Sequence, residues 1–309
     1  MSGFPFHTRA GFLGASPLQP THRFGLAGIA WDGCVTNRPG ARLGPKAIRS
    51  ASHQLCDAIH PLFDLTPTPH LGDAGDLDLP NTSLPAMREA MRAPVGALLA
   101  GHHMVWLGGD HSVTLPLLRA YRQHLGQPLA VLHFDAHCDT WVDHFGEPSG
   151  HGTWVYEALQ EGLVLPRAMM QFGIRSSGER AAREYVRDQG GLIFTGRDLR
   201  GLDSPAQLAP VLAQVRQRLA EEGMPPVYLS FDIDCLDPAF APGTGTPEPA
   251  GLSTAAAFTI LEELADLPFV GMDCVEVAPA YDHAELTTLA AAQLVWTYLS
   301  GRARTEGLG

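Results

Sequence analysis

The sequence lacks the cysteine patterns that hold together small secreted or zinc-binding folds. Its 309 residues contain five cysteines, an odd number, and no two of them form a Cys-x-x-Cys pair. Such usage is typical of a reduced compartment rather than of a disulfide framework. The first 21 residues also lack a basic start followed by an apolar run, so we expect no secretory signal and a cytoplasmic location.

Two further absences narrow the classes of partner. No stretch reaches about 18 consecutive apolar residues, the length that a membrane-spanning helix needs. The formal net charge of −12 argues against nucleic acid, because a nucleic-acid-binding protein carries a basic stripe. We therefore expect neither a membrane nor a nucleic acid as a partner.

What the sequence does contain is an alternation of apolar runs with segments of helical periodicity. Strands are expected at 24–31, 71–76, 104–109, 129–134, 169–174, 192–195, 227–231 and 269–277. Helices are expected at 46–56, 84–102, 114–124, 157–162, 181–189, 205–222, 254–265 and 286–299. This order predicts one α/β domain over residues 1–309, with a parallel sheet covered on both faces and residues 1–22 as an N-terminal arm. A TIM barrel would alternate in the same way, and periodicity alone does not separate the two folds.

Three polar residues follow the strand expected at 129–134. Asp135, His137 and Asp139 are spaced two apart, and an extended backbone would send all three side chains to one side. Two carboxylates and an imidazole at a strand end are costly to bury unless a cation lies between them. A divalent metal ion is the natural candidate.

Three other expected strands end in residues of the same kinds. One leads into Asp110 and His111, one into Asp232 and Asp234, and the last into Glu276. The ligand crevice of an open α/β sheet lies beyond the carboxyl ends of its strands, so these endings predict one shared site. Six metal ligands are expected: His111, Asp135, His137, Asp139, Asp232 and Asp234. His133 is expected to support them through a hydrogen bond, and Asp110 and Asp273 to be structural.

This ligand set predicts the number and kind of metal ions. Four carboxylates exceed what one ordinary ion needs, which favours two divalent ions. The oxygen-rich set without thiolates suits Mn²⁺, with Ni²⁺ and Zn²⁺ as alternatives. A water that bridges ions about 3.5–4 Å apart becomes a hydroxide nucleophile near neutral pH. The predicted reaction is hydrolysis at a polar, electron-poor carbon.

These motifs make the sequence similar to a known enzyme superfamily. The chain resembles the ureohydrolases, which include the arginases and agmatinases, and it is most similar to the agmatinase branch. The resemblance covers nearly the whole chain. Its most specific parts are residues 108–112 (Gly-Gly-Asp-His-Ser), 134–139 (Phe-Asp-Ala-His-Cys-Asp), 230–238 (Ser-Phe-Asp-Ile-Asp-Cys-Leu-Asp-Pro), 241–247 (Ala-Pro-Gly-Thr-Gly-Thr-Pro) and 275–279 (Val-Glu-Val-Ala-Pro).

The resemblance implies both a fold and a reaction. The fold is a three-layer α-β-α sandwich with an eight-stranded, mainly parallel sheet. The reaction is hydrolysis of a guanidino compound to urea and an amine by a metal-bridging hydroxide, with agmatine giving putrescine and urea as the favoured case. The six expected ligands match the family's metal-ligand positions, and the family implies a homo-oligomer, a trimer or hexamer.

Four residues are expected to act on the substrate. His151 matches the family histidine that passes a proton to the leaving amine, a role that needs titration near neutrality. Glu276 matches the carboxylate that grips the guanidinium. Asp139 would also orient the hydroxide. Trp141 is a candidate to stack on the planar guanidinium, and Trp31 and Trp154 could narrow the pocket with it.

The sequence of the loop at 140–150 differs from the usual agmatinase sequence, so the identity of the guanidino substrate stays undecided. Gly150 stands where many agmatinases have an aspartate, and the loop looks more like that of guanidinobutyrase. Asp143 or Glu147 could hold the distal ammonium of agmatine, whereas Arg42 could hold a guanidino acid. Free guanidine or an alkylguanidine, with nickel, is a further alternative. A noncatalytic subunit of a ureohydrolase complex is the alternative from another class.

Overall fold

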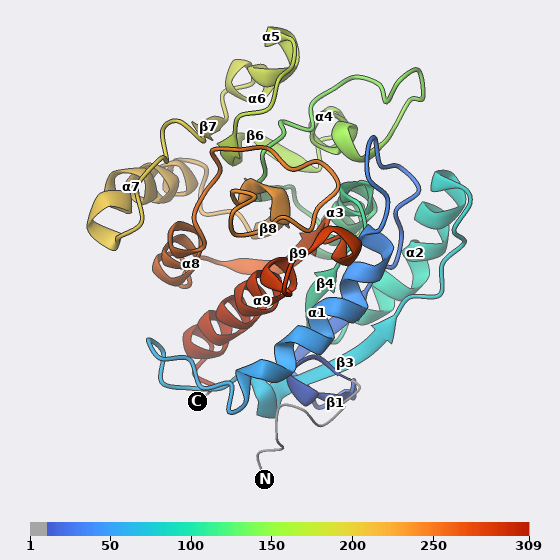
Figure 1. Cartoon of the computed structure of the whole chain (residues 1–309), viewed down its shortest axis with the longest axis vertical. Helices are drawn as coiled ribbons and strands as arrows, with labels where there is room; N and C mark the ends of the chain where they lie inside the picture. Colours follow the sequence, from blue (N-terminus) through green and yellow to red (C-terminus); the bar gives the residue numbers. More distant parts are fainter. Residues whose placement is uncertain (1–10, 309) are drawn as a thin grey trace.

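Short apolar runs form one central sheet in the computed structural model, which describes residues 11–308 (Figure 1). All strand pairings in this sheet are parallel, in the order β1-β3-β2-β4-β9-β8-β5-β6-β7. Most strands are buried on both faces, as a covered parallel sheet requires. The strands are β1 (Ser16–Pro17), β2 (Phe24–Gly28), β3 (Leu71–Asp76), β4 (His103–Leu107), β5 (Leu129–Phe134), β6 (Val164–Ile174), β7 (Leu192–Thr195), β8 (Val227–Asp232) and β9 (Phe269–Val275).

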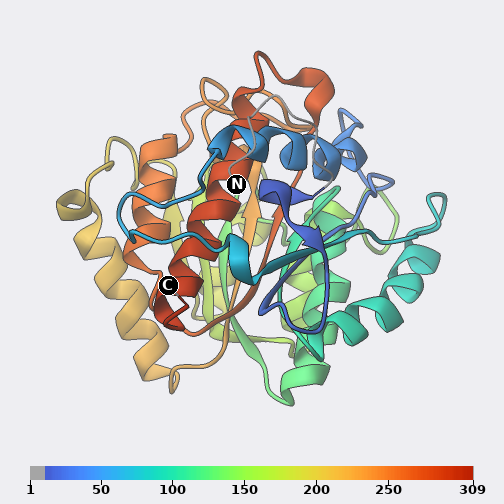
Figure 2. The ribbon, with the colours of Figure 1, turned by 90° about the horizontal axis from the view of Figure 1, so that it is seen from below.

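Helices cover both faces of the sheet and form the two outer layers (Figure 2). One core holds apolar residues of α1, α7, α8 and α9, and the other holds those of α2 to α6. The helices are α1 (Gly44–Ser52), α2 (Leu84–Leu99), α3 (Thr114–Leu125), α4 (Trp154–Gln160), α5 (Arg180–Arg183), α6 (Tyr185–Asp188), α7 (Pro205–Glu221), α8 (Thr254–Glu263) and α9 (Leu286–Thr305). The sheet is open, with β1 and β7 at its edges. The three-layer prediction is therefore confirmed, and a barrel is excluded.

The strand count differs from the expected eight because of the edge strand β1. Its two residues pair with β3 within a stretch whose Pro and Gly content gives no strand pattern. Just before β1, Phe12 and Leu13 are buried, and the Phe12 amide donates to Asp73 Oδ2 at 2.9 Å. Residues 11–22 thus pack on the sheet edge, whereas the rest of the predicted arm, residues 1–10, lies outside the described residues.

A second difference is the helix expected over 181–189. The structure has two short helices there, α5 and α6, because Glu184 leaves the helical conformation with φ −98° and ψ 0°. The first of them follows Ser176, Ser177 and Gly178, which extend the chain beyond the carboxyl end of β6. This segment therefore reaches the edge of the sheet where the polar residues gather.

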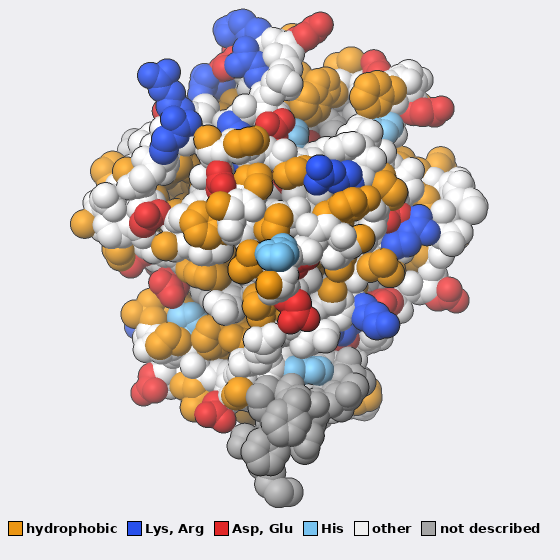
Figure 3. Space-filling view, viewed as in Figure 1, with side chains coloured by type: hydrophobic (Ala, Val, Ile, Leu, Met, Phe, Trp, Pro, Cys, Tyr) orange, Lys and Arg blue, Asp and Glu red, His pale blue; other side chains and the backbone are white. Residues whose placement is uncertain are grey.

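The surface and the helix lengths bear on the expected partners. Within residues 11–308, no helix is long and apolar enough to cross a membrane. On the face seen in Figure 3, lysine and arginine side chains are scattered among acidic and apolar ones, with their densest group at the top over α5 and α6. This face therefore shows no continuous basic stripe of the kind that nucleic acid needs.

Candidate metal centre and active-site cavity

The central strands β4, β9, β8 and β5 are neighbours, so their carboxyl ends meet at one edge of the sheet. Each of them delivers polar side chains there, as the sequence predicts. His111 begins the short helix η5 (His111–Val113) after β4, and Asp232 ends β8 just before η7 (Ile233–Cys235). Asp135 follows β5, and Glu276 follows β9. The structure brings all six residues expected to bind metal into one cluster: His111, Asp135, His137, Asp139, Asp232 and Asp234.

The first half of the cluster surrounds His111. Its Nδ1 lies 3.1 Å from Asp135 Oδ2, 3.1 Å from Asp139 Oδ2 and 3.2 Å from Asp232 Oδ2. On the other side of the ring, Nε2 lies 2.8 Å from Ser230 Oγ, and Ser230 in turn donates to Asp273 Oδ1 at 2.8 Å. Because the only hydroxyl proton of Ser230 goes to Asp273, Nε2 of His111 carries the proton and donates it to Ser230.

This tautomer tests whether the residues fit a metal ion. The neutral ring has an unprotonated Nδ1 whose lone pair faces three carboxylates, and this buried nitrogen has no hydrogen-bond partner among the described residues. A lone pair facing three anions is repulsive unless a cation lies between them. Burial lowers the pKa of His111, yet the three carboxylates raise it well above its usual value, so without a metal ion a proton on Nδ1 takes the place of the cation. The site therefore attracts a cation, and its donor set suits a divalent metal.

The second half of the cluster shares Asp135 with the first. His137 Nδ1 lies 3.2 Å from Asp135 Oδ1 and 3.1 Å from Asp234 Oδ2. His111 and His137 thus face the two oxygens of one carboxylate from opposite sides. Asp135, His137 and Asp234 form one group that could hold an ion, and His111, His133, Asp135 and Asp139 form another. Two neighbouring positions that share one carboxylate are the arrangement of a binuclear centre.

Burial makes the charge of this cluster costly. Its four carboxylates are nearly inaccessible to water, with at most 4% of any residue exposed. Burial, together with the neighbouring Asp234 and Asp135, raises the pKa of Asp232 well above its usual value. Four such groups cannot all ionise side by side in an apolar interior without positive charge.

Further buried residues hold the cluster in place. His133 Nε2 lies 2.8 Å from Asp135 Oδ2, which confirms the hydrogen bond expected of this histidine. Asp273 accepts from Ser230, Tyr228 and Thr114 and has no exposed surface, so it is structural in the sense predicted. Sequence reasoning missed Ser230, although its position one step before the expected strand end could have indicated it.

Glu276 and His151 form a second, adjoining pair. His151 Nδ1 lies 2.8 Å from Glu276 Oε1, which also accepts the amide of His111 at 2.9 Å. The other oxygen, Oε2, is buried without a partner among residues 11–308. Burial lowers the pKa of His151, but Glu276, with Asp110 and Asp139 nearby, raises it to about 9. Glu276 has a φ of 63°, a left-handed conformation that is uncommon for a residue other than glycine.

A cavity of about 560 Å³ opens above the cluster and the His151 pair. Trp141 lines it, as the sequence suggests, whereas the other two candidate tryptophans do not. Trp31 is 2% exposed and packs in the core beneath. Trp154 is fully buried, and its Nε1 donates to Asp139 Oδ2 at 2.7 Å. Trp31 is held by apolar packing and Trp154 also by its hydrogen bond to Asp139, and the local sequence reveals neither.

The rest of the cavity wall comes from the ends of other strands and from loops. The cavity residues that the sequence analysis does not predict include Thr36, Ser176, Ser177, Glu179, Thr246 and Glu248. The segment that contains Ser176 and Glu179 follows β6, so the strand-end rule that found the metal cluster could have found it too. Of the two carboxylates proposed for a distal ammonium, Asp143 lines the cavity and Glu147 does not. Arg42, proposed for a guanidino acid, pairs with Asp32 instead.

The spacing argument for Asp135, His137 and Asp139 is wrong in its detail. It assumes an extended backbone, but β5 ends at Phe134, and Asp139 has a φ of 52°. A turn beyond the strand, rather than strand alternation, brings the three side chains together. Asp139 is fixed there by its own carbonyl, which accepts the amides of Val155 and Tyr156 at the start of α4.

Comparisons with known proteins agree with this geometry. A family model described as the arginase family matches residues 22–300. An agmatinase of Chromobacterium violaceum is 44% identical over 279 residues, which are 87% of this chain and 80% of that protein. The crystal structure of a hypothetical agmatinase from Burkholderia thailandensis superposes with a TM-score of 0.88 at 35% identity, over 99% of this chain and 94% of that one. The proclavaminate amidino hydrolase of Streptomyces clavuligerus superposes with a TM-score of 0.88 at 34% identity, over 97% and 99% of the two chains.

Proposed function

The chain belongs to the arginase family, and from this premise we propose that it hydrolyses agmatine to putrescine and urea at a binuclear metal centre. The water oxygen adds to the guanidinium carbon, the bond from that carbon to the alkyl-bearing nitrogen breaks, and this nitrogen leaves with a proton as putrescine. Membership of the family makes the chain a metal-dependent hydrolase. The substrate and the role of each residue are the content of the proposal.

The unpartnered Nδ1 of His111 among its carboxylates supports the metal assignment. One ion would be held by His111, Asp135, Asp139 and Asp232, and the other by Asp135, His137 and Asp234. When bound, such ions offset the carboxylate charge and lower the pKa of a water molecule to near neutrality. The oxygen-rich set favours Mn²⁺, with Ni²⁺ as the alternative.

Two residues beside the centre handle the guanidinium and the proton. Glu276 Oε2 is a buried acceptor without a partner in the described chain, so it can receive an N–H of the substrate guanidinium in a charge-assisted hydrogen bond. His151 lies against the other oxygen of the same carboxylate, and Glu276 favours its protonated form. His151 is therefore placed to give a proton to the leaving amine. Asp139 orients the attacking water, and Trp141 flanks the guanidinium plane.

One observation supports agmatine as the substrate: the cavity is suited to bind the distal ammonium of agmatine in addition to its guanidinium. Asp143, Glu179 and Glu248 line it outside the metal cluster, and none of them forms an ion pair with any of residues 11–308. No lysine or arginine within that range lines the cavity. A guanidino acid would place its carboxylate among unpaired carboxylates, which is repulsive, whereas the ammonium of agmatine would be attracted.

We also propose, by family resemblance, that the protein works as a trimer or hexamer in the cytoplasm. Light scattering of the purified protein measures the first part directly. A mass of one chain at micromolar concentration would refute the oligomer without touching the proposed reaction.

Initial rates of urea release test the substrate. The Mn²⁺-loaded protein is compared on agmatine, 4-guanidinobutyrate, arginine and guanidine. We expect kcat/KM for agmatine to exceed that for 4-guanidinobutyrate by roughly 100-fold or more, because like charges are rejected. The double substitution Glu179→Gln with Glu248→Gln should raise KM for agmatine and leave hydrolysis of guanidine, which has no distal end, unchanged. A preference for the guanidino acid would overturn agmatine as substrate.

A further inference from the structure

His151 lies in a turn whose two flanking hydroxyl side chains converge on one carboxylate. Ser149 Oγ and Thr153 Oγ1 each donate to Glu157 Oε1, both at 2.6 Å. Thr153 Oγ1 also accepts the amide of Gly150 at 3.0 Å. One glutamate therefore holds the chain on both sides of the histidine.

Glu157 is itself held from a second helix. Its Oε2 lies 3.6 Å from Arg88 Nη1 of α2, and the two side chains are only 18% and 11% exposed. Nε and Nη2 of Arg88 are buried without a hydrogen-bond partner among the described residues. Burial lowers the pKa of Arg88, and Glu157 raises it. A buried guanidinium with so few partners is costly without a counter-charge. The ion pair with Arg88 therefore restrains the position of the Glu157 carboxylate.

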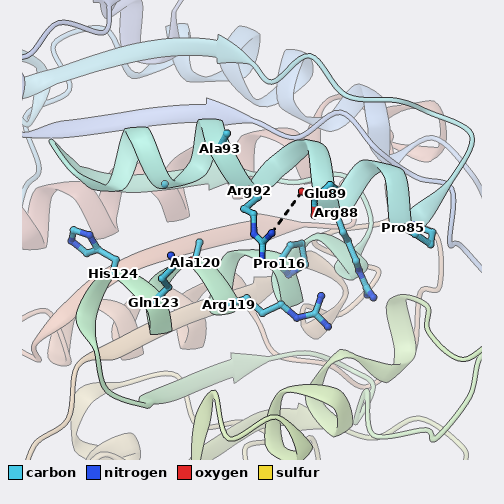
Figure 4. Close-up of a pocket in the computed structure, with 11 residues that line it drawn as sticks. Pro85, Arg88, Glu89, Arg92, Ala93, Pro116, Arg119, Ala120, Gln123 and His124 are labelled. Carbon is cyan, nitrogen blue, oxygen red and sulfur yellow. Dashed lines mark ion pairs between the residues drawn. The ribbon is translucent and has the colours of Figure 1, made fainter.

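Arg88 belongs to a groove of about 810 Å³ between α2 and α3 (Figure 4). In that view the side chains of Arg88, near the start of α2, and Arg119, in the middle of α3, project beside each other. Arg119 makes a similar contact at the end of α4, where its Nη2 lies 2.6 Å from Oε1 of Glu161, the residue that follows the helix. Helix α4 is thus tied to the α2–α3 layer at Glu157 and at Glu161, but only the tie at Glu157 touches the His151 turn.

Helix α4 is also fixed to the metal cluster. The amides of Val155 and Tyr156 donate to the carbonyl of Asp139 at 3.0 and 3.3 Å. Glu157 stands one residue further along the same helix. Glu157 therefore links the His151 turn to a helix that is hydrogen-bonded to Asp139 of the cluster.

We propose that Glu157 is a positioning residue that holds His151 in register with the metal cluster and with Glu276, and that Arg88 anchors it. The inference rests on the proposed role of His151 in catalysis. Its structural part, that Glu157 orders the turn, does not depend on the reaction.

The test compares Glu157→Ala with two matched variants. Glu157→Gln keeps an oxygen that accepts from both hydroxyls, and Glu161→Ala removes the other tie of α4 without touching the turn. Hydrogen–deuterium exchange over residues 149–153 of the full chain as purified reports the turn, whereas kcat and KM on agmatine report catalysis. Should Glu157→Ala fail to fold, Ser149→Ala removes one of the two hydrogen bonds and leaves the Arg88 contact and the bonds of Thr153 intact, so it should speed exchange in the turn to a smaller extent.

We expect Glu157→Ala to speed exchange in the turn and to lower kcat roughly 10- to 100-fold with KM within about 3-fold, because displaced catalytic groups lose rate rather than binding. Glu157→Gln should recover most of the rate because it keeps the oxygen that holds the turn, although the loss of the counter-charge of Arg88 should lower the free energy of unfolding. Glu161→Ala should match the wild type. Unchanged exchange in Glu157→Ala refutes the proposal. Faster exchange with unchanged kcat refutes its catalytic part. A wild-type protein that hydrolyses no guanidino compound refutes the proposed function, and the exchange data still decide whether Glu157 orders the turn.

Discussion

At the scale of single residues, the cluster is built around atoms that lack partners. Nδ1 of His111 and Oε2 of Glu276 are both buried without a hydrogen bond in the described chain. Unpaired buried groups are costly in a folded protein, and they persist where a ligand supplies the missing partner. A cation at His111 and a guanidinium N–H at Glu276 would satisfy the two atoms.

Substitutions of Asp234 and of His151 should distinguish residues that bind metal from residues that act only in catalysis. Asp234→Ala removes an oxygen that faces His137, so we expect loss of metal and activity at background level. His151→Ala leaves the cluster untouched, so metal content should stay at the wild-type level while kcat falls roughly 10²- to 10⁴-fold, as for loss of a general acid. Metal analysis after gel filtration, together with urea release, measures both. Full activity of His151→Ala would exclude it as the proton donor.

The charge of Glu276 controls the protonation of His151. In the metal-free wild type, His151 should titrate with a pKa of about 9, because Glu276 outweighs the effect of burial. In Glu276→Gln the carboxylate charge is gone, and the pKa should fall below 9 toward the ordinary value of 6.5 or lower. Nuclear magnetic resonance of the histidine rings follows this titration, with His151→Ala identifying the signal. An unchanged pKa in the variant would show that other groups set it.

At the scale of elements, the loop before His151 has no room for a side chain at position 150. Gly150 has an extended backbone, with φ −162° and ψ −164°, that any residue can adopt. A side chain there is nevertheless excluded, because its Cβ would lie 2.3 Å from Cγ of His144. The ring of His144 occupies that space and packs edge-on against His151, with 5.6 Å between ring centroids.

This packing predicts that substitutions of Gly150 and His144 have strongly non-additive effects on the free energy of unfolding. Gly150→Ala should lower the free energy of unfolding by about 1–3 kcal/mol, the usual cost of overpacking. Adding His144→Ala opens the space, so the double variant should recover most of that loss. Urea unfolding of the four proteins in the cycle gives the coupling energy. Additive effects would mean that His144 does not exclude a side chain at position 150.

The elements themselves were largely predictable from local pattern. Helices α2, α3 and α7 and strand β7 begin and end close to the expected residues, because each has clear periodicity and polar ends. The edge strand β1 was not predictable, since two residues of a Pro- and Gly-rich stretch are defined only by their pairing with β3. The break between α5 and α6 likewise has no Gly or Pro to mark it.

At the scale of the whole molecule, the strand endings predicted the site because the order of the sheet places β4, β9, β8 and β5 side by side. The residues of the metal cluster could be predicted from the sequence, whereas most residues of the cavity wall could not. Glu179 and Glu248 come from segments far apart in the chain, and only the fold places them on one cavity. The same limit explains Trp31 and Trp154, whose burial is decided by packing across elements.

His103 begins the central strand β4, at the end of the sheet opposite the metal cluster, and its burial makes the stability depend on pH. Burial, helped by Arg302 and Arg23, lowers its pKa from the ordinary 6.5 to about 3. Below pH 6.5 the unfolded chain binds a proton that the folded chain does not, so stability is lost as pH falls from about 6.5 toward 3. The loss attributable to His103 should approach about 1.4 kcal/mol per pH unit.

The comparison with His103→Gln isolates this contribution. The free energy of unfolding of the metal-free wild type should decline more steeply between pH 6 and pH 4 than that of the variant (roughly the range between the two pKa values). Tyr298, whose hydroxyl lies 2.8 Å from His103 Nε2, stays in both proteins. Parallel curves would assign the acid sensitivity to other groups.

The measurement that tests the binuclear hydrolase most directly is a titration of the metal-free protein with Mn²⁺, with urea release from agmatine followed at each addition. We predict negligible urea without metal, a rise with added Mn²⁺, and saturation at two ions per chain with equal amounts of urea and putrescine. Saturation at one ion, full activity of the metal-free chain, or no urea at any loading would contradict the account.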